Sequence, residues 1–329
     1  MSDVYRIFGS EMSPYSIKVR SYFRYKDIPH EWCEGQAEAA KPYQKLPLVP
    51  VVVTPEDRGI QDSTPIIEEM EALFPEPSIH PDDATLAFLS ALVEEFGDEW
   101  GNKWMFHYRW ARPADQVSAS ERLVRSMAPA LDDEQVAAMA AGIRERMVPR
   151  VWFVGSNETT APQIESSFHE VCEQLEAHLG ERPYLFGGRP AFGDFGLWGQ
   201  LYNAWSDPTC KAIVEAAGPH LVGWIQRMLA PKAEGPWESW DALAPTLLPI
   251  LKDQVGGLFC PWTVANAKAL ADGVDEYSVE IRTGTWTQKP QKYHARSLGK
   301  LREKYAAVRD EAALDPILAQ TGCLAALQG

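Results

Sequence analysis

The sequence predicts an α/β domain followed by an all-helical half. In residues 1–80, short apolar runs alternate with segments of helical periodicity. From about residue 86 onward, apolar residues recur every three or four positions over long stretches, and strand signals almost vanish until residue 277. Alternation of strand and helix favours a layered α/β domain, whereas long periodic runs favour helices packed on one another.

The first 80 residues read in the order strand, helix, strand, hairpin, helix. The run at 48–53 is β-branched with a proline near its start, which a strand tolerates there but not in its middle. A turn cluster at 54–59 separates it from a short returning strand at 60–61. The segment 62–65 (Asp-Ser-Thr-Pro) predicts the start of a helix, since its first residues are good caps. The other predicted elements are strands at 5–8 and 30–33 and a helix at 17–26.

A segment with three prolines, 75–81, separates this domain from a predicted helical domain at 86–255. The last part, 256–329, is predicted to be an extension that packs on the helical domain. In it, an alternating run from 277, a Thr-Gly turn and a second polar–aromatic run predict a β-hairpin, and a basic helix follows at 291–308. Further helices are expected at 121–149, 164–180, 194–205 and 211–229.

Bulk properties exclude several classes of protein. The formal net charge of −15 argues against nucleic acid as a main partner, because phosphate backbones bind basic surfaces. No run of about 20 apolar residues predicts a membrane span, and the first residues do not form a secretory signal. The five cysteines are scattered and lack a C-x-x-C pair, which favours reduced thiols over disulfides or a zinc site. We therefore expect a cytoplasmic protein without a metal site.

The segment 13–16 (Ser-Pro-Tyr-Ser) follows the first predicted strand and opens the first predicted helix. Ser13 is a good N-cap, and Pro14 suits the first helical position because its missing N–H costs nothing there. The pattern places a hydroxyl at the positive end of a helix. Such a position stabilises an anion, including a thiolate.

The order of elements, the X-Pro before the third strand, the Asp-Ser pair and the helical half together resemble the glutathione transferase superfamily. Members of that superfamily join a thioredoxin-like domain to a helical domain, and the resemblance covers roughly residues 4–230. Residues 190–195 (Pro-Ala-Phe-Gly-Asp-Phe) are similar to the helix-start motif of the family, but Ala191 stands where a Ser or Thr normally caps. Loss of that cap is expected to weaken the motif by about 1 kcal/mol.

The resemblance implies roles for the residues at the first helix. Ser13 occupies the place of the active-site serine in the serine-type classes and is expected to donate a hydrogen bond to the glutathione sulfur. Its neighbours Pro14, Tyr15 and Ser16 are expected beside the ligand. The motif looks like Cys-Pro-Tyr-Cys with both sulfurs replaced by oxygen, which argues against a thiol-disulfide oxidoreductase.

The resemblance also implies the rest of the glutathione site. Val49 and Pro50 match the cis-proline position, whose preceding backbone pairs with the cysteinyl part of glutathione. Asp62 and Ser63 match the Glu/Gln-Ser pair that holds the γ-glutamyl end. Lys45, just before the strand, is a candidate polar contact.

The segment 100–110 (WGNKWMFHYRW) is unusually aromatic. We expect it to line an apolar pocket above the sulfur, with Trp104, His107 and Tyr108 as the pocket residues. The alternative is that most of these rings build the helical core. Arg109 would suit an anionic substrate or an ion pair with Glu95 or Asp98.

The predicted function is that of a glutathione-dependent transferase, with glutathione as co-substrate and a small hydrophobic electrophile as second substrate. A homodimer is expected from the resemblance. Two alternatives remain open at this point: a non-catalytic binding protein that kept the fold, and a glutathione-dependent isomerase or ether-cleaving enzyme. The electrophile is selected by the shape of the pocket, so the sequence does not distinguish glutathione-dependent isomerisation or ether cleavage from conjugation.

Overall fold

The computed structural model describes residues 4–329, which begin with a four-stranded mixed sheet. The strands lie in the order β2-β1-β3-β4, with β1 parallel to β2 and the other two pairs antiparallel. Their bounds are β1 (Tyr5–Gly9), β2 (His30–Glu34), β3 (Val51–Val53) and β4 (Gly59–Gln61). The predicted strand at 48–53 begins only at Val51, since Pro50 has no N–H for a ladder.

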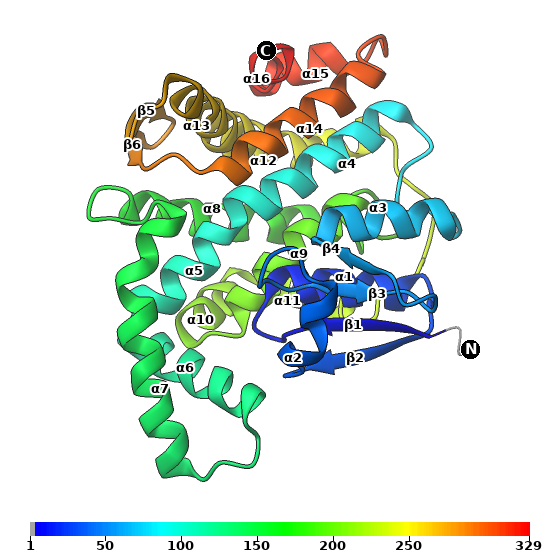
Figure 1. The fold of residues 1–329 in the computed structure, drawn as a ribbon. Helices are drawn as coiled ribbons and strands as arrows, with labels where there is room; N and C mark the ends of the chain where they lie inside the picture. Colours follow the sequence, from blue (N-terminus) through cyan, green and yellow to red (C-terminus); the bar gives the residue numbers. More distant parts are fainter. Residues whose placement is uncertain (1–3) are drawn as a thin grey trace.

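Side chains of the central strands alternate between the two faces of this sheet. Ile7 and Val52 lie in the core shared with α1 (Pro14–Tyr25) and α3 (Ser63–Leu73). Phe8, Val51 and Val53 form a second cluster with Ala40, at the end of the short helix α2 (Ala37–Ala40). A 3₁₀ turn, Lys41–Tyr43, follows α2. The arrangement confirms the predicted thioredoxin-like α/β domain (Figure 1).

The rest of the chain is largely helical, which confirms the predicted fold class. Helix α9 is buried along most of its length and packs against α1, α4 and α5, so it joins the two halves of the molecule. The predicted helix at 121–149 is two helices, because Pro129 follows the first and Asp132 caps the second. The helices of this half are α4 (Ala84–Phe96), α5 (Asn102–Ala111), α6 (Pro113–Met127), α7 (Asp133–Met147), α8 (Ala161–Leu179), α9 (Phe192–Trp205), α10 (Pro208–Ala217) and α11 (Pro219–Arg227). A π-helical turn, Gly97–Gly101, joins α4 to α5, and a 3₁₀ segment, Val148–Val154, follows α7.

The boundary expected at 255–256 falls inside one continuous helical stretch. Helix α12 (Trp240–Ile250) runs through a π-helical segment, Leu251–Phe259, into α13 (Cys260–Asp272). The Gly-Gly pair in the middle does not break the helix. Instead, Gly256 lets the carbonyl of Thr321 approach so closely that a Cβ would collide with it.

The predicted hairpin forms from β5 (Tyr277–Ile281) and β6 (Gly284–Gln288). The basic helix α14 (Lys292–Val308) follows and lies along α4 and α13, and α15 (Leu314–Thr321) and α16 (Leu324–Gln328) complete the chain (Figure 1). Within residues 4–329, no helix is long and apolar enough to cross a membrane.

Candidate glutathione site

Ser13 is the N-cap of α1, as its sequence context predicts. Its backbone is extended (φ −107°, ψ 113°), and its Oγ accepts a hydrogen bond from the backbone N–H of Ser16 at 3.3 Å. That bond uses an oxygen lone pair and leaves the hydroxyl hydrogen free to donate. The half-buried Ser13 therefore presents a donor at the positive end of a 12-residue helix.

Two contacts from the helical domain fix the start of α1. Gly199 of α9 faces the carbonyl of Pro14, and a Cβ there would lie only 2.7 Å from that oxygen. The buried guanidinium of Arg109 donates to the carbonyl of Met12 at 3.1 Å and pairs with Asp207 at 2.7 Å. Arg109 thus supports the loop before Ser13, and its acidic partner is neither Glu95 nor Asp98.

Val49 and Pro50 lie across from Ser13, and the peptide bond between them is cis. The loop before them is held by Gln61, which the sequence analysis did not single out. Its side chain donates to the carbonyls of Leu46 and Leu48 at 2.7 and 2.9 Å and accepts from the N–H of Lys45 at 2.9 Å. Gln61 therefore fixes the backbone on which the predicted contacts Lys45 and Val49 lie.

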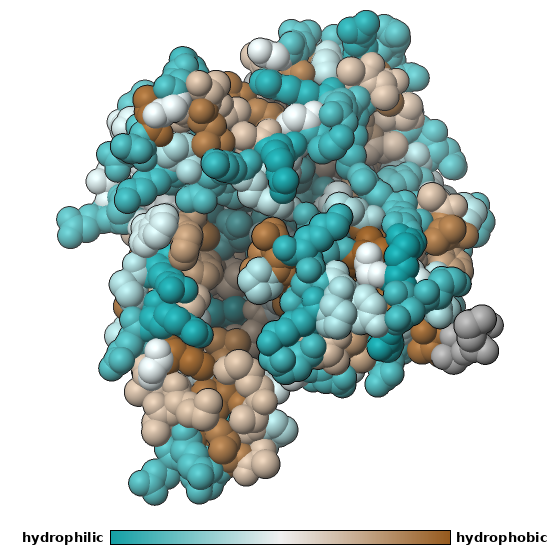
Figure 2. All heavy atoms as spheres, in the orientation of Figure 1, coloured by the Kyte–Doolittle hydropathy of each residue, from teal (hydrophilic) through white to brown (hydrophobic). Residues whose placement is uncertain are grey.

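Two adjoining cavities meet at this point. One, of about 510 Å³, is lined by Ser13, Pro14, Tyr15, Val49 and apolar residues of the helical domain. The other, of about 600 Å³, is lined by Tyr15, Val49, Pro50 and Asp62, together with Lys45 and Gln61. Figure 2 shows the surface hollowed between the N-terminal domain and the helices α5–α7, with apolar residues exposed inside. The fold thus brings most of the predicted glutathione contacts to two cavities that share Tyr15, Leu48 and Val49 in their walls.

Ser16 and Ser63 are placed differently from the other predicted contacts. Both are buried, and neither is among the residues that line the two cavities. The side-chain oxygen of each lacks a hydrogen-bond partner within residues 4–329. Ser63 is nevertheless the first residue of α3, directly after Asp62, and the N–H groups of that turn have no partner inside the helix.

The aromatic segment turns the opposite face from the expected one toward the cavity. Trp104 is fully buried and donates to Ser167 at 3.0 Å, and Tyr108 packs in the same core. His107 lies between Ser156 and Glu165, and burial lowers its pKa. The expectation that Trp104, His107 and Tyr108 form the substrate pocket is therefore wrong.

The residues of this segment that do line the 510 Å³ cavity are Asn102, Met105 and Phe106. Helical periodicity predicts which residues share a face, but it does not say which face meets the cavity and which meets the core. The larger rings lie on the core face because α5 packs against α8 and α9 on that side.

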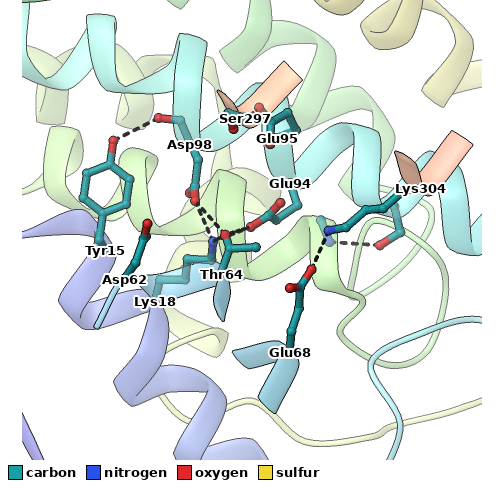
Figure 3. Close-up of polar contacts among 12 residues, drawn as sticks. Tyr15, Lys18, Asp62, Thr64, Glu68, Glu94, Glu95, Asp98, Ser297 and Lys304 are labelled. Atoms are coloured by element: carbon teal, nitrogen blue, oxygen red, sulfur yellow. Dashed lines mark hydrogen bonds and ion pairs between the residues drawn. The ribbon is translucent and has the colours of Figure 1, made fainter. Parts of the chain in front are cut away.

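A buried charge network lies behind the cavity, at the junction of the two domains (Figure 3). Lys18 of α1 contacts Glu94 at 2.5 Å and Asp98 at 2.7 Å, and all three side chains are nearly inaccessible. The hydroxyl of Tyr15 donates to the backbone carbonyl of Asp98 at 3.0 Å. Burial among other carboxylates raises the pKa of Asp98 to about 8. This network positions Tyr15 against the helical domain.

The five cysteines are all buried free thiols, and none lines either cavity. Cys33 lies on β2, with its sulfur against the carbonyl of Glu31. Within residues 4–329, no group of three or more His, Cys, Asp or Glu side chains is arranged to hold a metal ion. At the start of α1, the cavity therefore meets the Ser13 hydroxyl and the positive end of the helix, and no thiol of the described residues lines it.

Comparison with protein families agrees with this architecture. Residues 7–78 match the family model for the glutathione S-transferase N-terminal domain, and residues 130–227 match the model for its C-terminal domain. The chain belongs to the glutathione S-transferase superfamily. No curated protein sequence matches the chain.

Solved glutathione S-transferases are similar to this superfamily member at low identity. One from Methylobacterium radiotolerans, in complex with glutathione sulfonate, is 19% identical over 72% of this chain and 96% of its own, with a TM-score of 0.44. The transferase GSTFuA3 from Phanerochaete chrysosporium is 19% identical over 70% and 98%, with a TM-score of 0.45. The β-etherase LigF from Sphingobium sp. is 18% identical over 69% and 95%, with a TM-score of 0.42.

Proposed function

We propose that the chain is a glutathione-dependent transferase. The observation that carries the proposal is the convergence of Ser13, Val49 and Asp62 on two adjoining cavities that share Tyr15 and Val49. Glutathione would lie across β3 with its cysteinyl backbone beside Val49. Its sulfur would lie at Ser13 and its γ-glutamyl end at Asp62.

The chemistry follows from the position of Ser13. A hydroxyl that donates to sulfur, together with the positive end of α1, favours the thiolate over the thiol and lowers the thiol pKa. The thiol proton leaves to solvent. The thiolate then attacks an electrophilic carbon, so that a C–S bond forms while the bond to the leaving group breaks and its electron pair leaves with that group.

The 510 Å³ cavity suits the second substrate. Met105, Phe106 and Val154 of the helical domain and Leu48 of the N-terminal domain give it apolar walls next to Ser13. A hydrophobic electrophile held there would meet the sulfur without a separate bimolecular encounter, which removes much of the entropic barrier.

Calorimetry with glutathione tests the binding step. We expect the wild-type chain to bind glutathione at millimolar concentration or below and Asp62→Asn to bind it less tightly, because the Asp62 carboxylate lines the cavity where the γ-glutamyl end would lie. Asp275→Asn, at an exposed position just before the hairpin, is the control and should bind as the wild type does. A wild-type sample that does not respond to glutathione would refute the proposal.

Turnover separates an enzyme from a non-catalytic glutathione-binding protein. A chlorinated dinitrobenzene is a suitable probe electrophile, because it is flat, apolar and reports conjugation by absorbance. Reduction of a mixed disulfide should be near zero, since no cysteine lines the cavities. The homodimer remains a prediction from the family resemblance, and the cytoplasmic location remains a prediction from the cysteine pattern and the first residues.

A further inference from the structure

The helix α14 of the C-terminal extension reaches the 600 Å³ cavity. Tyr293 and Arg296, one turn apart on α14, line it together with Asp62 and Pro65 at the start of α3. The hydroxyl of Tyr293 donates to the carboxylate of Asp62, with oxygen–oxygen distances of 3.2 and 3.4 Å. The cavity proposed for glutathione is therefore walled by residues 231 positions apart in the sequence.

Several contacts hold α14 in this place. His294 contacts Glu99 in the π-helical turn and Ser297 contacts Glu95 in the last turn of α4, so two successive turns of α14 are tied to the end of α4 and the junction after it. Farther along, Lys304 pairs with Glu68 of α3 at 2.7 Å (Figure 3).

A cation–π contact holds the extension from the other side. The buried ammonium of Lys103 lies 3.8 Å from the ring centroid of Trp262 on α13, the helix that packs against α14. The first turns of α14 are therefore held in place by contacts with both domains.

Arg296 is the cationic group at this end of the cavity. Its side chain is exposed, and within residues 4–329 it forms no ion pair and no hydrogen bond; its guanidinium carbon lies 5.9 Å from the ring of Tyr293. Two of the acids that line cavities with Arg296 have other partners, since Asp62 accepts from Tyr293 and Glu95 accepts from Ser297. In a chain of net charge −15, an unpaired guanidinium at a cavity wall is a ready partner for a carboxylate.

We infer that α14 completes the glutathione site, with Arg296 binding the γ-glutamyl carboxylate and Tyr293 holding Asp62 toward the γ-glutamyl ammonium. The inference rests on the proposed function. The γ-glutamyl end carries a carboxylate and an ammonium on one carbon. Arg296 and Asp62 offer the opposite charges at the same end of one cavity, as that pair requires.

The test compares two ligands on two proteins. The ligands are glutathione and γ-aminobutyryl-cysteinylglycine, which lacks only the γ-glutamyl carboxylate. By calorimetry, we expect the wild-type chain to bind glutathione at least about 10-fold more tightly than the analogue, a preference of about 1.4 kcal/mol. We expect this preference to fall below about 3-fold in Arg296→Gln, because the charge-assisted hydrogen bonds are lost.

Three further variants make the test specific. Lys292→Gln removes the same charge one turn earlier on α14 from an exposed side chain outside the cavity wall, and it should keep the full preference. Arg296→Lys should keep part of it, since the charge remains but the planar fork is lost. Tyr293→Phe should weaken binding of both ligands alike, by about 2- to 5-fold, since Asp62 loses its donor.

The possible outcomes separate this inference from the proposed function. If the wild type binds glutathione and Arg296→Gln keeps the same preference for it, the role of Arg296 is wrong while the proposed function survives. If the wild type does not discriminate between the two ligands, the γ-glutamyl carboxylate is not read at this helix. If the wild type binds neither ligand, both the inference and the proposed function are overturned.

Discussion

The ammonium group of Lys18 lies 2.7 Å from the carboxylate of Asp98, across the junction of the two domains. Lys18 belongs to the helix that Ser13 caps, and Asp98 belongs to the π-helical turn whose backbone carbonyl accepts from Tyr15. Glu94, Glu95 and Glu99 share this buried region with Asp98. Negative groups therefore outnumber positive ones there, and burial raises the pKa values of Glu95, Asp98 and Glu99 above those of exposed carboxylates.

Asp98 should make stability depend on pH. Burial raises its pKa from 3.8 to about 8, so the folded state binds this proton more tightly than the unfolded state. Its contribution to the free energy of unfolding is fully present below about pH 4 and is lost as pH rises through about 8. Relative to Asp98→Asn, the wild type should therefore lose at least about 1 kcal/mol between pH 5.5 and 8.5.

Urea unfolding at several pH values measures this difference. Asp272→Asn is the control, because Asp272 forms an exposed ion pair with Lys268, and its curve should run parallel to the wild type. Parallel curves for Asp98→Asn as well would mean that Asp98 titrates like an ordinary carboxylate.

Ser13→Ala should raise the pKa of the bound glutathione thiol by about one unit while changing the affinity, measured at a pH where the thiol stays protonated, by less than about 2-fold. The reason is that the lost hydroxyl bonds to the thiolate and contributes little to holding the neutral ligand. Thiolate absorbance in the ultraviolet, followed against pH on the protein–glutathione complex, gives this pKa. The same substitution removes an N-cap and should cost about 1 kcal/mol of stability.

Ser10→Ala is the matched control for that experiment, since Ser10 lies in the same loop and its Oγ accepts from the N–H of Met12. It should leave the thiol pKa unchanged. A shift in Ser10→Ala without one in Ser13→Ala would move the donor role to Ser10.

Ser13→Cys should confer disulfide reduction on a chain that lacks it. The new thiol would lie at the N-terminus of α1, where the helix dipole lowers the pKa of a thiol and increases the thiolate fraction. An assay with a small mixed disulfide and glutathione should rise from near background to a clearly measurable rate. An equally active wild type would point to one of the five buried cysteines instead.

Phe106→Ala and Trp104→Ala should affect different properties, substrate binding and stability, although the residues are only two positions apart. Phe106 lines the cavity and is only partly buried against the core, so its loss should raise the KM for a chlorinated dinitrobenzene several-fold, leave glutathione affinity nearly unchanged and cost less stability than the loss of Trp104. Trp104 is fully buried, so its loss should destabilise the fold by about 3–5 kcal/mol. Steady-state kinetics and urea unfolding of both variants separate the pocket from the core, and a large stability loss in Phe106→Ala would contradict this assignment.

The local features of the N-terminal domain around Ser13 and Pro50 could be predicted because their causes are local. Ser13 caps a helix with Pro14 after it, and the third strand starts after Pro50, for reasons that a few adjacent residues contain. The prediction for the aromatic segment at 100–110 was wrong for the opposite reason. Its spacing is helical whichever way the helix turns, and only packing against α8 and α9 decided that Trp104 enters the core and Phe106 the cavity.

By itself, the sequence determined the α/β-then-helical order, the cap at Ser13 and the approximate place of the basic helix near the end. Tertiary structure alone decided that this helix brings Tyr293 to Asp62 and that Lys18 faces Asp98. Such pairs depend on how separate elements dock, and docking is set by the summed packing of many side chains. No local pattern around any one of these four residues contains that information.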